Sequence, residues 1–241
     1  MSEVLKSELL RSISGFAMLG VASFVILIPG LTLSLGPPLD GLRALDDGMA
    51  TRMVFGLIAS VGIVAMYLGS YAVSPEFYYH SMPRTVVISS LRKVFAAKLI
   101  SSAVTSAGLC LVGVVVWAGV TAVVLATNGR QTLIDGAWWT IVGGSLFAAV
   151  CGGVIGAAAG WILRNYYAVS GLVLMVPLMI ELPLLFSAPE VERFFPVGAF
   201  AGVTGAPIDG LLPWWGSAIV LFAWAAVSAA LAAVVVRRRD G

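Results

Sequence analysis

The chain has 241 residues, of which 60% are hydrophobic and only 11% are charged, and its mean hydropathy is +1.01. A soluble domain carries roughly 25% charged residues, so this composition excludes a water-facing globular protein and predicts an integral membrane protein. The net charge is +2, and the longest basic run, Arg237–Arg239, follows an apolar stretch at the chain end. Such a cluster is typical of cytoplasmic anchoring and gives no indication of nucleic-acid binding.

The first segment, residues 2–14, places Leu5, Leu9 and Ile13 at four-residue spacing. This pattern predicts a short amphipathic helix that lies on the inner membrane surface. The uncharged stretch that follows, Ser12 to Leu39, is 28 residues long. A signal peptide has an apolar region of roughly 7–15 residues, so we interpret this stretch as a retained membrane span.

Six segments contain the roughly 20 apolar residues that a spanning helix needs. Their apolar runs are continuous rather than alternating, which favours helices over barrel strands. The sequence therefore predicts an all-α protein, a single transmembrane domain over residues 1–241 with six spans. The predicted spans are 15–35, 53–74, 97–126, 137–163, 166–186 and 214–236.

The distribution of Lys and Arg predicts the orientation. If both termini are cytoplasmic, ten of the 14 basic residues lie in inner segments and four lie in outer segments. Positive residues concentrate on the cytoplasmic side of membrane proteins. We therefore expect a multi-pass protein of the cell membrane with both termini inside.

The inner loop between the second and third spans combines aromatic, charged and turn-forming residues. It begins at Pro75-Glu76 and continues through Leu91-Arg92-Lys93 to Ala96-Ala97-Lys98. Exposed aromatic residues flanked by charges suit a docking surface for a partner protein. Tyrosines also anchor many proteins at the headgroup level, so interfacial anchoring stays open as the second interpretation.

These residues, the amphipathic first helix, the six spans and the long outer segment before the last span resemble the permeases of type-2 ATP-binding-cassette (ABC) exporters. The sequence departs from that family at Ser81-Met82-Pro83, where Gly-Thr is commoner. The resemblance implies two permease copies and a coupling helix that seats in a cytoplasmic ATPase, which binds ATP and Mg. The residues of the implied coupling helix are Glu76, Phe77, Tyr78, Tyr79, His80, Ser81, Met82, Pro83 and Arg84.

No catalytic or cofactor motif accompanies this resemblance. The chain has no G-x-x-x-x-G-K-[ST] loop, so we expect it not to be an enzyme and to rely on a partner for ATP hydrolysis. With His80 as the only histidine and with Cys110 and Cys151 far apart in apolar runs, we expect no metal site and no bound cofactor.

Two features lie within the predicted spans. Glu181 is a charged residue deep in the fifth span, and it is either a residue of the substrate path or a protonated or paired structural residue. The fourth span carries small residues at strict four-residue spacing, which predicts close helix packing. These residues are Gly144, Ala148, Gly152, Gly156 and Gly160.

The outer segment 187–213 holds an uncharged run, Phe194 to Ile208, of 15 residues. That length is too short to span, so we expect either a re-entrant or surface-lying helical pair that caps the outer face, or an ordered loop. The resemblance implies export, and the few charges within the spans favour a hydrophobic or amphipathic cargo, such as a lipid, peptide or drug. An ATP-independent secondary carrier or a membrane scaffold subunit is the alternative, and a membrane-embedded enzyme comes third.

Overall fold

The computed structural model describes residues 2–13, 17–35, 39–81 and 90–238, and within these ranges the chain forms helices and turns without a strand. Among the described residues, five helices are long and apolar enough to cross a membrane. They coincide with the predicted second to sixth spans and confirm a helical membrane protein. Their bounds are Asp47–Tyr78, Leu91–Thr127, Gly136–Leu163, Tyr166–Ser187 and Trp214–Arg237.

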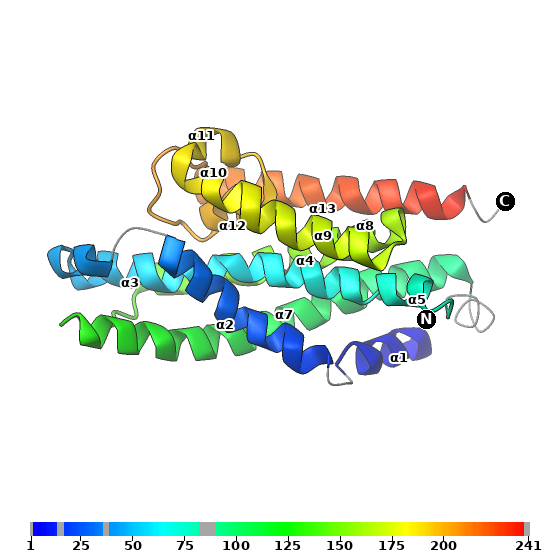
Figure 1. The fold of residues 1–241 in the computed structure, drawn as a ribbon, viewed down its shortest axis with the longest axis horizontal. Coiled ribbons are helices and arrows are strands. Elements are labelled where there is room, and N and C mark those ends of the chain that lie inside the picture. Colours follow the sequence, from blue (N-terminus) through cyan, green and yellow to red (C-terminus); the bar gives the residue numbers. More distant parts are fainter. Residues whose placement is uncertain (1, 14–16, 36–38, 82–89, 239–241) are drawn as a thin grey trace.

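The predicted first span coincides with α2, Ala17–Leu35, which has 19 residues and contains Pro29. The stretch Gly20–Ser34 of α2 is apolar, and α2 as a whole is shorter than the other five helices. Before it, α1 is a separate helix over Ser2–Ile13, where a short helix was predicted. Figure 1 shows α1, the end of α5 and the last turns of α13 at the same end of the molecule.

The second span lies in the middle of the helix bundle and packs against most of the other helices. It consists of α3 (Asp47–Phe55), a 3₁₀ segment η2 (Gly56–Ser60), α4 (Val61–Tyr71) and α5 (Ser74–Tyr78). Its apolar side chains are mostly buried, because α2, α7, α8 and α9 surround it. By contrast α7, Leu91–Thr127, has 37 residues and is about 55 Å long, so it is longer than a bilayer core of about 30 Å.

Helix α8, Gly136–Leu163, packs closely against α4 through the small residues that the sequence singles out. A methyl group on Gly152 would overlap the carbonyl of Gly62, and one on Gly156 would overlap the carbonyl of Met66. Along the same face, Gly144 meets α12 (Pro196–Val203), Gly160 meets Val73, and Ala148 is fully buried.

The fifth span changes geometry part-way. After α9 (Tyr166–Val176) comes η3 (Pro177–Glu181), one turn of π-helix, and then α10 (Leu182–Ser187). The outer segment adds α11 (Pro189–Glu192) and α12, and α13 (Trp214–Arg237) completes the fold. Figure 1 shows α10, α11 and α12 grouped beside the start of α13. All eight residues of α12 are buried, so this second short helix of the outer segment is enclosed by protein.

Candidate functional site

Four charged side chains from three helices form a cluster at the end of the molecule where α5 ends. The cluster consists of Glu8, Arg11, Glu76 and Lys98. The Nζ of Lys98 lies 2.6 Å from Oε1 of Glu76 and 2.8 Å from Oε2 of Glu8, and it also donates to the carbonyl oxygen of Ala72 at 2.9 Å. Arg11 makes a further ion pair with Glu76. The cluster contains two acidic and two basic groups, so it is electrically balanced.

The charged cluster is buried at its centre. Lys98 is 0% exposed and Glu76 is 2% exposed. Removing charges from water is costly, and such groups are stable only when their partners remain in place. The cluster therefore ties α1, the end of α5 and the beginning of α7 into one rigid unit.

Glu76 thus faces inward rather than onto a docking surface. The next residue, Phe77, packs edge-on against Trp161 with ring centroids 5.6 Å apart, and the Arg164 guanidinium lies 4.8 Å from the Phe77 ring centre. The first two residues of the implied coupling helix are therefore internal contacts that hold α5 in place.

The implied helix over residues 76–84 is not one helix in the described part. It ends at Tyr78, and His80 takes a left-handed conformation with φ of 53°. The amide of Ser81 donates to the carbonyl of Glu76 at 2.9 Å, and that of His80 donates to the carbonyl of Phe77 at 3.3 Å. This pair of bonds is the Schellman termination, which stops a helix and turns the chain. Met82, Pro83 and Arg84 lie outside the described residues.

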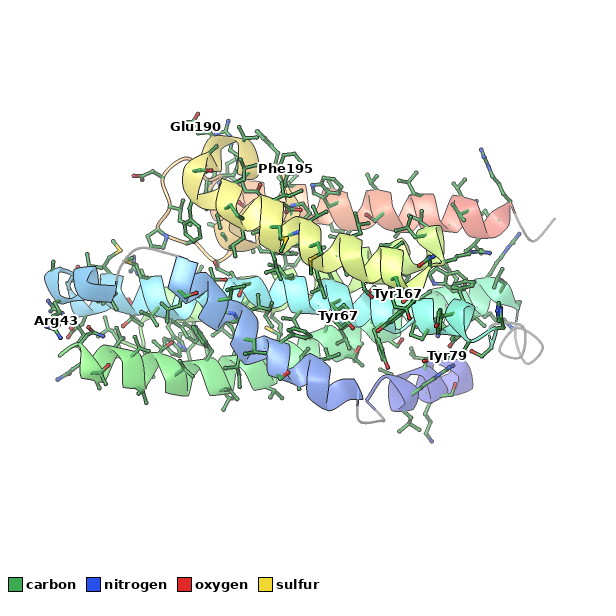
Figure 2. All side chains as sticks on the ribbon, in the orientation of Figure 1. Arg43, Tyr67, Tyr79, Tyr167, Glu190 and Phe195 are labelled. Atoms are coloured by element: carbon green, nitrogen blue, oxygen red, sulfur yellow. The ribbon has the colours of Figure 1, made fainter. Side chains whose placement is uncertain are left out.

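All six tyrosines of the chain gather beside this helix end, and Figure 2 labels three of them. Neighbouring rings in this tyrosine cluster have centroids 5.0–6.4 Å apart, and the hydroxyls of Tyr78 and Tyr167 are 3.4 Å apart. Tyr79 is the most exposed of them, at 73%. The members are Tyr67, Tyr71, Tyr78, Tyr79, Tyr166 and Tyr167.

Sequence reasoning singled out Tyr78 and Tyr79 but missed Tyr166, Tyr167 and Arg164. The sequence could have indicated these residues, because a second pair of tyrosines stands at the predicted inner end of the fifth span. Only the packing of α9 against α4 and α5 shows that the two pairs form one surface.

The second candidate site lies deeper in the fifth span, at the π-helical turn η3. Glu181, predicted as a residue of the substrate path, is 7% exposed and lines an apolar cavity of about 380 Å³ between α4, α8, α9 and α13. Its Oε2 accepts a hydrogen bond from the amide of Val197 at 2.9 Å. Another cavity, of about 290 Å³, lies between α2, η2, α10 and α12.

Glu192, which sequence reasoning missed, lies beside Glu181, because the two carboxyl groups accept from the consecutive amides of Val197 and Gly198. It is fully buried, and its Oε1 accepts from the amide of Gly198 at 3.2 Å. Burial, followed by the charge of Glu181, raises the pKa of the Glu192 carboxyl well above its usual range. The sequence signal was a second Glu close after Glu181 in an otherwise apolar region.

Among the described residues, no group of three or more His, Cys, Asp or Glu side chains could hold a metal ion. No protein-family model matches the sequence, and no curated protein matches it.

Proposed function

We propose that this chain is the permease of a type-2 ABC exporter, which moves a hydrophobic or amphipathic molecule out of the cytoplasm. In this proposal α2 is the first of six spans and both termini are cytoplasmic. A second permease copy, identical or similar, completes the path, and separate ATPase subunits bind ATP and Mg.

The observation that carries the proposal is the contrast between Glu76 and Tyr79. Glu76 is locked inside the charged cluster, whereas Tyr78 and Tyr79, two and three residues later, are 48% and 73% exposed. Exposed aromatic residues on a rigid base are typical binding anchors. Because the charged cluster joins the end of α5 to α4 and α7, a displacement of these tyrosines would move α4 and α7 as well. A coupling element needs such a rigid connection.

The apolar lining of the two cavities supports a hydrophobic or amphipathic cargo. The cavity beside Glu181 is lined almost entirely by apolar side chains, with Glu181 and Ser228 as its polar residues. The cavity beside α2 is likewise apolar, with Arg52 as its one charged residue. Such walls suit an apolar molecule with at most one polar group.

A photoreactive residue in place of Tyr79, introduced in native membranes, tests the proposal. We expect a covalent adduct with a protein that carries a G-x-x-x-x-G-K-[ST] loop, and ATP hydrolysis by the purified complex. The same residue in place of the exposed Ile134, in the predicted outer loop, is the matched control and should give no such adduct. Transport that continues without ATP, together with no nucleotide-binding adduct, would reject the proposal.

A proton-coupled secondary carrier is the second candidate, because Glu181 and Glu192 bury two carboxyl groups. Buried ionisable residues in membrane proteins commonly belong to ion or proton pathways. Dissipating the proton gradient while ATP is maintained distinguishes the two candidates, since only the carrier stops.

A further inference from the structure

The first turn of α12 is capped in an unusual way. The amides at the start of a helix lack partners within the helix and are usually satisfied by a polar residue at the N-cap. Here the N-cap is Phe195, which has no capping side chain. The amides of Val197 and Gly198 instead donate to Glu181 and Glu192, which come from η3 and α11.

This arrangement brings two acidic groups together in a buried place. Two adjacent carboxylates out of contact with water cannot both be ionised at low cost, so one proton stabilises the pair. The amides of α12 stabilise the remaining negative charge. Oε2 of Glu192 is buried and has no hydrogen-bond partner, so a proton on it would not displace an existing bond.

No cation neutralises the pair within the described part of the chain. The Arg193 guanidinium lies against the Phe194 ring, and Arg52, in the neighbouring cavity, pairs with Asp135. Helix α12 itself has no titratable side chain. The titratable groups on the surrounding helices make no hydrogen bond or ion pair with either carboxyl group in the described part of the chain. They are Tyr67 and Tyr71 on α4, Cys151 on α8, Tyr166 and Tyr167 on α9, and Arg237 at the far end of α13, with Glu190 and Asp209 exposed.

We infer that Glu181 and Glu192 form a proton-binding site that locks α12 onto the fifth span. When the proton leaves to the outer solution, the two carboxylates repel each other, and this repulsion moves at least one of them away from the first amides of α12. The proton site therefore controls the position of α12. This inference does not depend on which energy source drives the proposed transport.

The position of α12 matters because its first residues form walls of both cavities. Phe195 and Pro196 line the cavity beside Glu181, and Val197, Phe200 and Ala201 line the cavity beside α2. Helices α12 and α11 are in close contact here, since a methyl group on Gly198 would overlap the backbone carbonyl of Glu192. Release of α12 would open both cavities toward the outer side.

Labelling of a buried cysteine tests this inference in the full-length protein, in a lipid nanodisc. Cys110 and Cys151 are first replaced by Ala, and then Ala199, which is fully buried on α12, is replaced by Cys. We expect the rate of thiol labelling, corrected for the ionisation of the thiol, to rise from mildly acidic to mildly alkaline pH. The slope should approach about tenfold per pH unit, as for release of one proton.

Glu192→Gln is the decisive variant, because Gln can still accept from Gly198 and donate to Glu181 but cannot ionise. We expect slow labelling at every pH in this variant. Glu190→Gln, on the exposed rim of the same short helix (Figure 2), should retain the wild-type pH dependence.

An infrared difference spectrum gives a second measurement that works even if the cysteine variant folds poorly. Raising the pH should remove a carboxylic-acid carbonyl band, and that band should be absent in Glu192→Gln. Labelling that does not change with pH, or a pH response that survives in Glu192→Gln, would overturn the inference.

Discussion

Lys98 and Glu76 form a buried ion pair, 2.6 Å between Nζ and Oε1, that joins the beginning of α7 to the end of α5. Because Lys98 also binds Glu8 and the Ala72 carbonyl, a single ammonium group holds three helices together. The aromatic surface of Tyr78 and Tyr79 lies directly beside this junction.

Replacing Lys98 with Met should destabilise the protein strongly. Glu76 would keep Arg11, but Glu8 would lose its buried cation, and breaking a buried pair typically costs about 3–5 kcal/mol. The measurement is thermal unfolding in detergent. Lys93→Met, on the exposed side of the same helix, is the matched control and should unfold like the wild type. Equal melting of the two variants would mean that the cluster contributes nothing to stability.

The double variant Tyr78→Ala/Tyr79→Ala should fold and oligomerise normally but lose its ATPase. Aromatic anchors at an interface commonly contribute about 2 kcal/mol or more, so association should weaken more than tenfold. Co-purification of the ATPase and its stimulation by substrate are the measurements. The control is Leu133→Ala/Ile134→Ala, at exposed positions before α8. Unchanged association in the tyrosine variant would remove the main support for the exporter.

Gly152→Leu should prevent folding or assembly. The added side chain would enter the Gly62 backbone, and overpacking of this kind should cost about 3 kcal/mol or more. Gly143→Leu lies on the same helix with open space beside it and should be tolerated. Size-exclusion profiles of the two variants in detergent give the comparison, and a monodisperse Gly152→Leu protein would show that α8 and α4 can separate.

Cysteine labelling in intact cells tests the orientation that the basic residues predict. Ile134→Cys and Glu190→Cys, both exposed, should react with an impermeant thiol reagent. Ser90→Cys, exposed at the start of α7, should react only after the cells are opened. Labelling at Ser90 from outside would reverse the topology.

Glu192→Gln should also change how stability depends on pH. Because the pKa of Glu192 is raised in the folded protein, the folded state holds a proton that the unfolded state releases. Stability is then greatest below the unfolded pKa of about 4.3 and falls as the pH rises toward the folded value. The Gln variant should melt at a higher temperature than the wild type at mildly alkaline pH and show a flatter profile. A wild-type profile that rises with pH would contradict the assigned shift.

The local sequence was sufficient to predict the five long apolar helices of the described residues. The predicted spans 53–74, 137–163 and 214–236 lie within or close to Asp47–Tyr78, Gly136–Leu163 and Trp214–Arg237. Bilayer thickness and the need to pair every backbone amide act on each segment separately, so composition and length are enough. The small-residue ridge of α8 was visible for the same reason, because a four-residue spacing places its members on one helical face.

The interior contacts depended on the tertiary structure. Nothing in the inner loop indicates that Glu76 turns toward Lys98 and Glu8 while Tyr79 stays outside, because this requires α1 to lie beside α7. Glu181 and Glu192 likewise come together only at the first turn of α12, because α12 packs against both η3 and α11. Charged groups in an apolar interior are stable only with partners that the fold brings from elsewhere in the chain, so their roles follow from three-dimensional packing and not from their local sequence.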